Sequence, residues 1–291
     1  MRYAFYPGCS LESSASEYRI STEKIAAALG IELDEIPEWI CCGSTPAHMT
    51  GEILSLALPA YNLVLASRMK TEGVIVSCAS CYSRLKHANF ILKNDPRKQD
   101  LVAEVLGERY DGSVPVFHLL EVVVDLIDKP TFGELIKVDL GELKVASYYG
   151  CLLVRPPEVT DFDDPEDPQI MDRIVEALGA QTVAYNYKVE CCGAALAFPQ
   201  VEIVRKLSGD ILQDAKDSGA DIILVACPLC HSNLDMRQRE IEKYLGVDLE
   251  IPVLYFTQLM GLAFGFGPGE LGLEKHVIDV GPVLKRLRIR V

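Results

Sequence analysis

The sequence has no long apolar run. Its longest apolar segments, such as Leu119–Ile127 and Ile222–Cys227, fall far short of the ~20 residues that a membrane-spanning helix needs. The first residues, Met1–Pro7, contain too short an apolar stretch for a secretory signal. We therefore expect a cytoplasmic protein that has no membrane partner.

Positive charge is also scarce. The 291 residues include 28 lysines and arginines against 42 aspartates and glutamates, which gives a formal net charge of −14. A surface this acidic repels phosphate backbones, so nucleic acid is not an expected partner, whereas a basic patch on another protein is. Apolar residues make up 49% and charged residues 24% of the chain, a composition typical of a folded protein with a packed core.

The C-x2-C-x2-C-x3-C run of bacterial ferredoxins is missing, yet the chain is rich in cysteine. Because reducing compartments disfavour structural disulfides, clustered thiols in a cytosolic chain indicate metal or redox chemistry. Without a ferredoxin-type run, electrons are expected to arrive from another protein of a complex. The ten cysteines are Cys9, Cys41, Cys42, Cys78, Cys81, Cys151, Cys191, Cys192, Cys227 and Cys230.

The cysteines form two sets of five with similar spacing. The first set reads C-x31-CC-x35-C-x2-C and the second reads C-x39-CC-x34-C-x2-C. Equivalent cysteines lie 142 residues apart at the first position and 149 or 150 residues apart at the others. The flanks repeat as well, since Tyr6-Pro7-Gly8-Cys9 matches Tyr148-Tyr149-Gly150-Cys151. These repeats predict an internal duplication.

Each half alternates short apolar runs with helical patterns. Short apolar runs are typical of parallel strands buried on both faces, and the alternation favours α/β layering. We expect an α/β fold of two similar Rossmann-like or flavodoxin-like units with mainly parallel sheets. The first domain is expected to cover residues 1–135 and the second 136–291, because Pro130 and Gly133 interrupt the pattern there.

The single cysteine and the C-x2-C motif of each set follow predicted strands. Ligand sites in open α/β sheets form outside the carboxyl ends of the strands, so each set can converge on one rim. Helix N-termini at the C-x2-C motifs favour thiolates. Gly43 and Gly193 directly follow the cysteine pairs and are expected to let the backbone approach a bound cluster. Five thiolates exceed the four of a zinc site or a cubane cluster, which favours a polynuclear iron–sulfur site of unusual shape in each half.

Other uses of the cysteines explain fewer of them. A pair of structural zinc sites would leave one cysteine over in each half, and a disulfide scaffold conflicts with the missing secretory signal. Thioredoxin-like chemistry at Cys78–Cys81 would leave the remaining cysteines unexplained. Haem attachment at the C-x-x-C-H run Cys227–His231 would leave Cys151 and the Cys191–Cys192 pair without a role.

The doubled pattern of a single cysteine, a CCG sequence and a C-x2-C motif resembles the cysteine-rich CCG domain family over the whole chain. The segments Pro7–Leu11, Ile36–Gly43 and Ser77–Lys86 further resemble the B subunits of the CoB–CoM heterodisulfide reductases of methanogenic archaea. Other members of the CCG family serve lactate or glycolate oxidation, anaerobic glycerol-3-phosphate dehydrogenation, and quinone or fumarate reduction.

The resemblance implies that each set of five cysteines binds a noncubane [4Fe-4S] cluster. It also implies a catalytic subunit that reduces the heterodisulfide CoM-S-S-CoB to CoM-SH and CoB-SH, with one electron per cluster, in the electron-bifurcating complex of methanogenesis. The implied partners are a ferredoxin-like C subunit with cubane [4Fe-4S] clusters, a flavin-containing A subunit, and a hydrogenase or formate dehydrogenase. The alternative is an electron-transfer subunit of a lactate, glycolate or glycerol-3-phosphate dehydrogenase, or of a quinone or fumarate reductase.

Several other side chains are candidate site residues. An anionic substrate group in an acidic protein needs cations close to the cysteines, with salt bridges or a solvated surface as the ordinary alternative. The candidates for substrate binding are Arg84, Lys86, Arg155, Lys188, Gly43 and Gly193. His231 could donate a proton to a product thiolate, or it could be a capping or surface histidine. Asp161–Asp167 is expected to be a solvated acidic loop.

Overall fold

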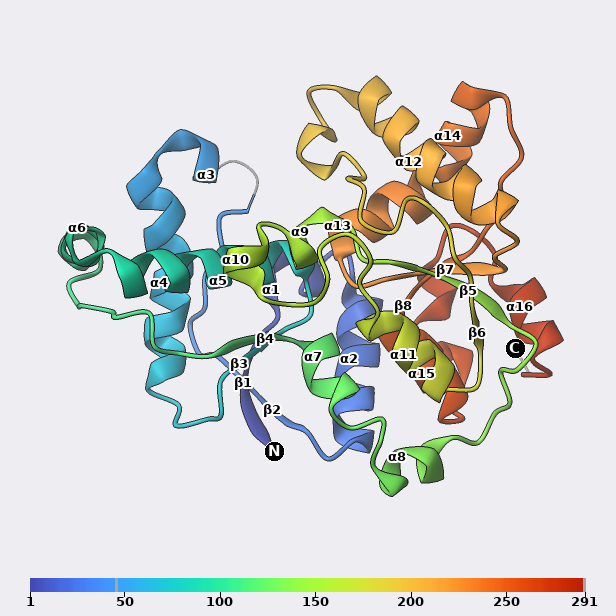
Figure 1. The fold of residues 1–291 in the computed structure, drawn as a ribbon, viewed down its shortest axis with the longest axis horizontal. Helices are drawn as coiled ribbons and strands as arrows, with labels where there is room; N and C mark the ends of the chain where they lie inside the picture. The colour runs from blue at the N-terminus through green and yellow to red at the C-terminus, as the bar shows by residue number, and fades with distance from the viewer. Residues whose placement is uncertain (45–46, 290–291) are drawn as a thin grey trace.

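The computed structural model describes residues 1–44 and 47–289, and it contains two four-stranded parallel sheets (Figure 1). The first sheet has the strand order β2-β1-β3-β4, with β1 (Arg2–Tyr6), β2 (Glu32–Glu35), β3 (Val74–Val76) and β4 (Val116–His118). The second has the order β6-β5-β7-β8, with β5 (Lys144–Tyr148), β6 (Gln181–Thr182), β7 (Ile222–Val225) and β8 (Val253–Tyr255). The two orders are the same, which confirms the predicted duplication of an α/β unit.

The inner strands are apolar because helices cover both of their faces. Every residue of β3 and β7 is buried, as are the last four residues of β1 and of β5. The edge strand β2 is the acidic sequence Glu32–Glu35, and none of its residues is buried. All six strand pairings are parallel, so both sheets present the carboxyl ends of their strands on one side.

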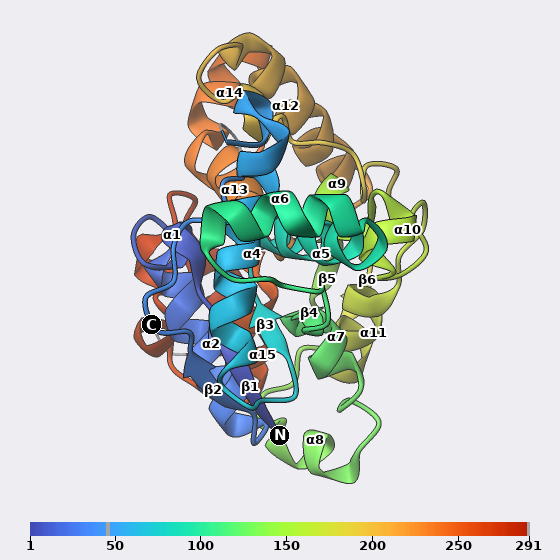
Figure 2. The same ribbon diagram turned by 90° about the vertical axis from the view of Figure 1, so that its left-hand side faces the viewer.

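The helices of the first half follow its strands in sequence. They are α1 (Gly8–Leu11), α2 (Ser16–Ala28), α3 (Ala47–Thr50), α4 (Glu52–Ser67), α5 (Ala79–Asn94), α6 (Pro96–Leu106) and α7 (Leu119–Val124). The Asp95 carboxylate caps α6, which ends at the left-handed Gly107. Figure 2 shows α6 lying over α4 and α5 on the outside of the molecule. This helix has no counterpart in the second half and buries only Val102.

The helices of the second half repeat the arrangement, and several of them are short. They are α9 (Cys151–Val154), α10 (Pro157–Thr160), α11 (Ile170–Ala177), α12 (Val201–Asp217), α13 (Pro228–His231), α14 (Gln238–Leu245), α15 (Phe256–Ala263) and α16 (Gly281–Arg286). Short 3-10 turns form η1 (Ala194–Leu196), η3 (Pro268–Leu271) and η4 (Leu273–Lys275), and a π-helical turn forms η2 (Ser232–Met236). Among the described residues, no helix is long and apolar enough to cross a membrane.

The two halves share one core. Helix α8 (Pro130–Leu135) lies on the path between them, at the bottom of Figure 1. Helix α15 packs against α2, and α7 packs against α11, so the helix that follows the last strand of each sheet packs against the other half. The Tyr18 ring stacks on the Tyr255 ring with centroids 3.9 Å apart. The buried apolar cluster runs through both halves, and the position of one unit is therefore fixed by the other.

Candidate functional site

The cysteines gather where strands of each sheet end. Cys78 follows β3 after one intervening residue and occupies the N-cap position of α5, so the C-x2-C motif lies where a strand turns into a helix. Cys227 does the same between β7 and α13, where Pro228 occupies the first helical position. Cys9 lies in α1 just after β1, and Cys151 begins α9 just after β5. The equivalent placement in the two halves produces two equivalent sites.

The thiols of each set lie in contact. Cys42 Sγ is 3.3 Å from Cys81 Sγ, and Cys192 Sγ is 3.7 Å from Cys230 Sγ. All ten cysteines are free thiols. Cys9, Cys41 and Cys191 are exposed, while Cys151 is half-buried. The buried thiols are Cys42, Cys78, Cys81, Cys192, Cys227 and Cys230. Each set thus combines buried thiols with thiols that solvent reaches, and its five soft donors suit iron–sulfur ligation.

The two sites meet at the boundary between the halves. The Cys78 and Cys227 thiols lie near each other, and this proximity raises the pKa of Cys78. Next to them, the Ala79 amide donates to the Ala226 carbonyl at 3.3 Å. His118 Nε2 lies 3.1 Å from the Ser77 carbonyl and 3.2 Å from the Ala226 carbonyl, and burial lowers the pKa of its ring to about 4. The neutral His118 therefore joins the two C-x2-C strand ends.

Two tyrosines hold the CCG loops, and sequence reasoning did not assign them a role. The Tyr6 hydroxyl donates to the Ile40 carbonyl at 2.8 Å, and the Tyr148 hydroxyl donates to the Glu190 carbonyl at 2.7 Å. Ile40 and Glu190 each precede a cysteine pair. Burial raises the pKa of both tyrosines, so each hydroxyl stays a donor. The repeated Tyr-x-Gly-Cys segment is the sequence feature that could have identified these tyrosines as part of the site.

The second CCG loop is fixed by further hydrogen bonds. The Gly193 amide donates to Cys191 Sγ at 3.3 Å, and Ser208 Oγ donates to the Cys192 carbonyl at 3.0 Å. A hydrogen bond from the Cys151 thiol, helped by the Gly193 amide, lowers the pKa of Cys191 to about 6. This exposed thiol is therefore prepared to be a thiolate, the form that binds metal.

The glycines beside the cysteines have two different roles. A Cβ on Gly8 would stand 3.0 Å from Cys81 Sγ, and one on Gly150 would stand 3.3 Å from Cys230 Sγ. A Cβ on Gly43 would instead meet Leu58 Cδ1 of α4 at 2.7 Å, and one on Gly193 would meet Val204 Cγ2 of α12 at 3.2 Å. Gly8 and Gly150 therefore leave room at the thiols, while Gly43 and Gly193 leave room for packed helices.

Of the four basic candidates, the structure brings Arg84 to the site. Its guanidinium lines a cavity that also touches the second set of cysteines. The Lys86 ammonium lies 5.4 Å from the centroid of the Tyr82 ring. Arg155 pairs with Glu166 at 3.0 Å, and Lys188 pairs with Asp167 at 3.0 Å and Asp172 at 3.1 Å. Arg155 and Lys188 thus hold the acidic segment Asp161–Asp167, which was expected to be only solvated.

His231 lies beside the second site without facing its cavity. Its ring is buried and stacks on the Tyr255 ring, with centroids 4.5 Å apart. Its Nε2 is 3.1 Å from the Val253 carbonyl and 3.2 Å from His276 Nδ1. These contacts point the ring nitrogen at Val253 and His276, and His231 is not among the residues that line the cavity.

The cavity at the second site measures about 170 Å³ and has walls from both halves. All five cysteines of the second set line it, so it is the space that a cluster bound there would fill. Its remaining wall includes Ser44, Ala79, Ser80 and Arg84 of the first half. The Ser44 and Ser80 hydroxyls hydrogen-bond to each other at that wall. A group bound to the second set would therefore lie against the first half.

Comparison with known proteins identifies the family of this chain. The profile of the cysteine-rich CCG domain matches residues 3–86 and 145–235. The 8-methylmenaquinol:fumarate reductase membrane anchor subunit of Wolinella succinogenes is 35% identical over 95% of this chain and 97% of its own length. The B subunit of the ferredoxin:CoB–CoM heterodisulfide reductase of Methanosarcina mazei is 32% identical over 96% of this chain and 94% of its own.

A solved structure shows the same fold. A hypothetical protein from Helicobacter pylori superposes with a TM-score of 0.77 at 15% identity, covering 96% of this chain and 52% of that one. The paired CCG matches cover both cysteine sets, and the relatives align over nearly the full chain. The chain belongs to the cysteine-rich CCG domain family and is related to the B subunits of CoB–CoM heterodisulfide reductases.

Proposed function

We propose that this chain is the catalytic iron–sulfur subunit of a heterodisulfide reductase and that it reduces CoM-S-S-CoB to CoM-SH and CoB-SH. Each set of five cysteines holds one noncubane [4Fe-4S] cluster in this proposal. The observation that best supports this proposal is the cavity at the second site, because the first half supplies part of its wall. A substrate that binds to a cluster held in this cavity would lie against both halves, whereas a simple electron relay needs no such contact.

The residues present fit two clusters of this kind. The thiols of each set are in contact, all are free, and a backbone N–H group donates to a thiol in the second set. When bound, the clusters would supply one electron each and iron atoms that hold sulfur. The cavity at the second set is mainly apolar, with Ala79, Leu152 and Leu229 in its walls, and these side chains limit the access of water to the thiols.

Arg84 would attract the anionic end of the substrate. It is the cavity's positively charged residue, and the rest of the protein is strongly acidic. Its guanidinium is partly desolvated, which strengthens its attraction for an anion. Reduction of the disulfide takes two electrons and two protons and yields two thiols, so both halves must contribute if each site passes one electron. The contact between Cys78 and Cys227 brings the two sites close enough for that cooperation.

The electron supply belongs to partner proteins in this proposal. The chain has no ferredoxin-type cysteine run, so a ferredoxin-like C subunit with cubane clusters would deliver electrons from a flavin-containing A subunit. The flavin protein would bifurcate electrons that come from a hydrogenase or formate dehydrogenase. The net charge of −14 suits a basic docking face on such a partner. We place the assembly in the cytoplasm.

A second function is supported by one specific observation. The 35% identical relative belongs to an 8-methylmenaquinol:fumarate reductase, and it aligns over nearly the whole chain. In that function the two clusters would carry electrons between a quinol and a flavin dehydrogenase. The second cavity would then hold a cluster alone, and Arg84 would have no substrate to bind.

Single-turnover chemistry separates the two functions. The anaerobically purified protein would be reduced, mixed with CoM-S-S-CoB, and analysed for CoM-SH and CoB-SH, and in parallel the oxidised protein would be mixed with a menaquinol analogue and analysed for quinol oxidation. We expect both thiols in equal amounts from the disulfide and no oxidation of the quinol. The proposal also requires that Cys42→Ala and Cys192→Ala each abolish thiol release. Oxidation of the quinol without thiol release would establish the electron-transfer function instead.

A further inference from the structure

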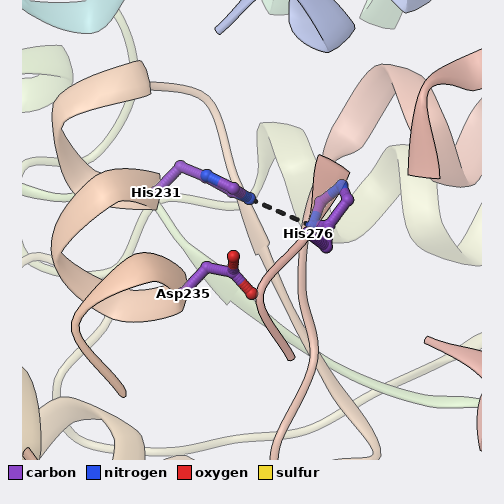
Figure 3. Close-up of side chains that lie close together, drawn as sticks. All are labelled: His231, Asp235 and His276. Atoms are coloured by element: carbon purple, nitrogen blue, oxygen red, sulfur yellow. Dashed lines mark hydrogen bonds between the residues drawn. The ribbon is translucent and has the colours of Figure 1, made fainter. Parts of the chain in front are cut away.

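The second half contains a buried group of metal-binding side chains that lies outside both cysteine sets. His231, Asp235 and His276 point toward one another, and one ligand atom from each lies within 4.8 Å of the others (Figure 3). His231 Nε2 and His276 Nδ1 are 3.2 Å apart. Two ligands bound to one ion at about 2.0–2.1 Å in tetrahedral geometry stand roughly 3.3 Å apart. The two nitrogens therefore already have the separation that a shared ion requires.

The local fold fixes the direction of each side chain. His231 and Asp235 are four residues apart, and the π-helical turn η2 turns both toward the segment after η4. The Asp235 carboxylate accepts from the Val277 amide at 2.8 Å and the Ile278 amide at 3.3 Å. Both contacts hold its oxygens beside His276.

The hydrogen bonds also determine the tautomer of His276. Gln258 Nε2 donates to the Leu271 carbonyl, and Gln258 Oε1 accepts from the Tyr255 amide at 2.9 Å. Gln258 Oε1 is thus an acceptor, and His276 Nε2 must donate to it across their 3.1 Å separation. This leaves His276 Nδ1 without hydrogen and its lone pair directed at His231. Metal-bound histidines are commonly oriented by such a bond from the second ring nitrogen.

The first half places a cation at the equivalent position. Tyr82 and Lys86 lie 149 residues before His231 and Asp235, and the Lys86 ammonium sits over the Tyr82 ring. Glu121, the counterpart of Gln258, completes that group and accepts from the His118 amide at 2.6 Å. In the second half the lysine is replaced by the fully buried Asp235, and none of the described arginines or lysines forms an ion pair with it. The second half therefore has a buried carboxylate where the first half has a positive charge.

We propose that His231, Asp235 and His276 bind a zinc-type divalent cation, with the Val253 carbonyl as the fourth ligand. That carbonyl lies 3.1 Å from His231 Nε2, within the spacing of neighbouring ligands. Two imidazoles with oxygen ligands suit Zn²⁺, and the ion would supply the positive charge that the first half obtains from Lys86. It would tie the segment after η4 to the residue that follows Cys230 and so support the second cysteine set.

Zinc analysis of the full-length holoprotein tests this proposal. The protein would be purified anaerobically with its clusters, incubated with Zn²⁺ and desalted, and its zinc, iron and sulfide measured. We expect about one zinc per chain. X-ray absorption at the zinc edge is expected to show nitrogen and oxygen neighbours only. Sulfur neighbours would assign the zinc to the cysteines and overturn the proposal, as would a protein that retains no zinc.

Variants test whether the ion binds at these residues. Asp235→Asn and His276→Gln keep the size of each side chain, and both are expected to lose the zinc while keeping the iron. His87→Gln, which alters a half-buried histidine of α5, is the matched control and is expected to keep it. Zinc retained in full by both site variants would overturn the proposal. If either variant fails to fold, the edge spectrum of the unmodified protein decides the question.

Discussion

Arg84 and Asn233 occupy equivalent positions in the two halves, each three residues after the last cysteine of its C-x2-C motif. Asn233 Nδ2 lies 3.5 Å from Cys192 Sγ and donates to the Cys192 carbonyl at 3.0 Å. In the first half, hydrogen bonds from Cys41 and Cys81 lower the pKa of Cys42, and the positive charge of Arg84 lowers it further. The first site therefore has a cation at this position where the second has a neutral amide, and the same arginine also lines the cavity of the second site.

This difference predicts unequal reduction potentials. A cation near an anionic cluster stabilises the added electron, so the first cluster is expected to have the higher potential. Arg84→Gln should lower the potential of that cluster by roughly 50 mV, the order given by Coulomb's law for a unit charge in a partly solvated protein. Redox titration followed by EPR measures the shift. Arg84→Lys retains the positive charge and should keep the potential close to its original value, and the exposed Arg97→Gln should change neither potential. An unchanged potential in Arg84→Gln would contradict the expectation.

Gly8 and Gly30 offer a matched pair of glycines in the first half. Their φ angles are +69° and +70°, so alanine at either position costs roughly 1–2 kcal/mol of backbone strain. Only at Gly8 would the new Cβ meet a thiol, at 3.0 Å from Cys81 Sγ, because a Cβ on Gly30 would have no atom within 4 Å apart from those of its chain neighbours. We expect similar losses of thermal stability from Gly8→Ala and Gly30→Ala, but loss of iron only from Gly8→Ala. Equal iron contents in the two variants would show that the thiols can move aside.

Tyr148→Phe tests the hydroxyl that holds the second CCG loop. The variant removes the hydrogen bond to the Glu190 carbonyl and should cost about 1 kcal/mol of stability. Because the loop carries Cys191 and Cys192, iron should be released to a chelator several times faster. Tyr185→Phe is the control, since it removes a buried hydrogen bond to the Ser147 carbonyl that does not touch this loop. Iron release at the same rate in both variants would show that the Tyr148 hydroxyl does not help the second cysteine set to retain iron.

The sequence was sufficient to predict the duplication and the position of the thiols. Strands that end just before Cys9 and Cys78 bring those residues to one rim, since the carboxyl ends of parallel strands lie on one side of a sheet. The ion-pair partners of the basic residues could not be predicted in this way. Arg155 and Lys188 are neutralised by Glu166 and Asp167, and that pairing depends on how a loop folds back rather than on any local pattern.

The contact between the halves was also beyond sequence reasoning. Two equivalent units can be joined in many ways, and the helical pattern of α2 does not indicate that its buried face meets α15. The structure shows Ser21 Oγ and Thr257 Oγ1 at 2.7 Å across this contact, inside a continuous core. Separate expression of residues 1–135 and 136–291 would expose that core. For this reason the single-site variants Cys42→Ala and Cys192→Ala are the better test of whether both clusters are needed.

Glu121 predicts a pH dependence of stability. Burial raises the pKa of its carboxyl from 4.5 to about 7, although the His118 amide and Lys86 oppose the shift. The folded protein thus holds this proton more tightly than the unfolded chain does. The resulting stabilisation is fully present below about pH 4.5 and is lost as the pH rises through about 7. Its upper limit is on the order of 3 kcal/mol, from about 1.4 kcal/mol per pKa unit.

The variant Glu121→Gln should remove this dependence. Gln258 occupies the equivalent position of the second half and accepts from the Tyr255 amide at 2.9 Å, so the chain itself shows that glutamine can cap this helix. Between pH 5 and pH 8 the melting temperature of the unmodified protein should fall further than that of Glu121→Gln, since only the unmodified carboxyl must ionise inside the protein. Calorimetry of both proteins under anaerobic conditions measures the difference in melting temperature. The contributions of all other titrating groups cancel in this difference. Parallel melting curves over this range would mean that Lys86 fully compensates the buried charge.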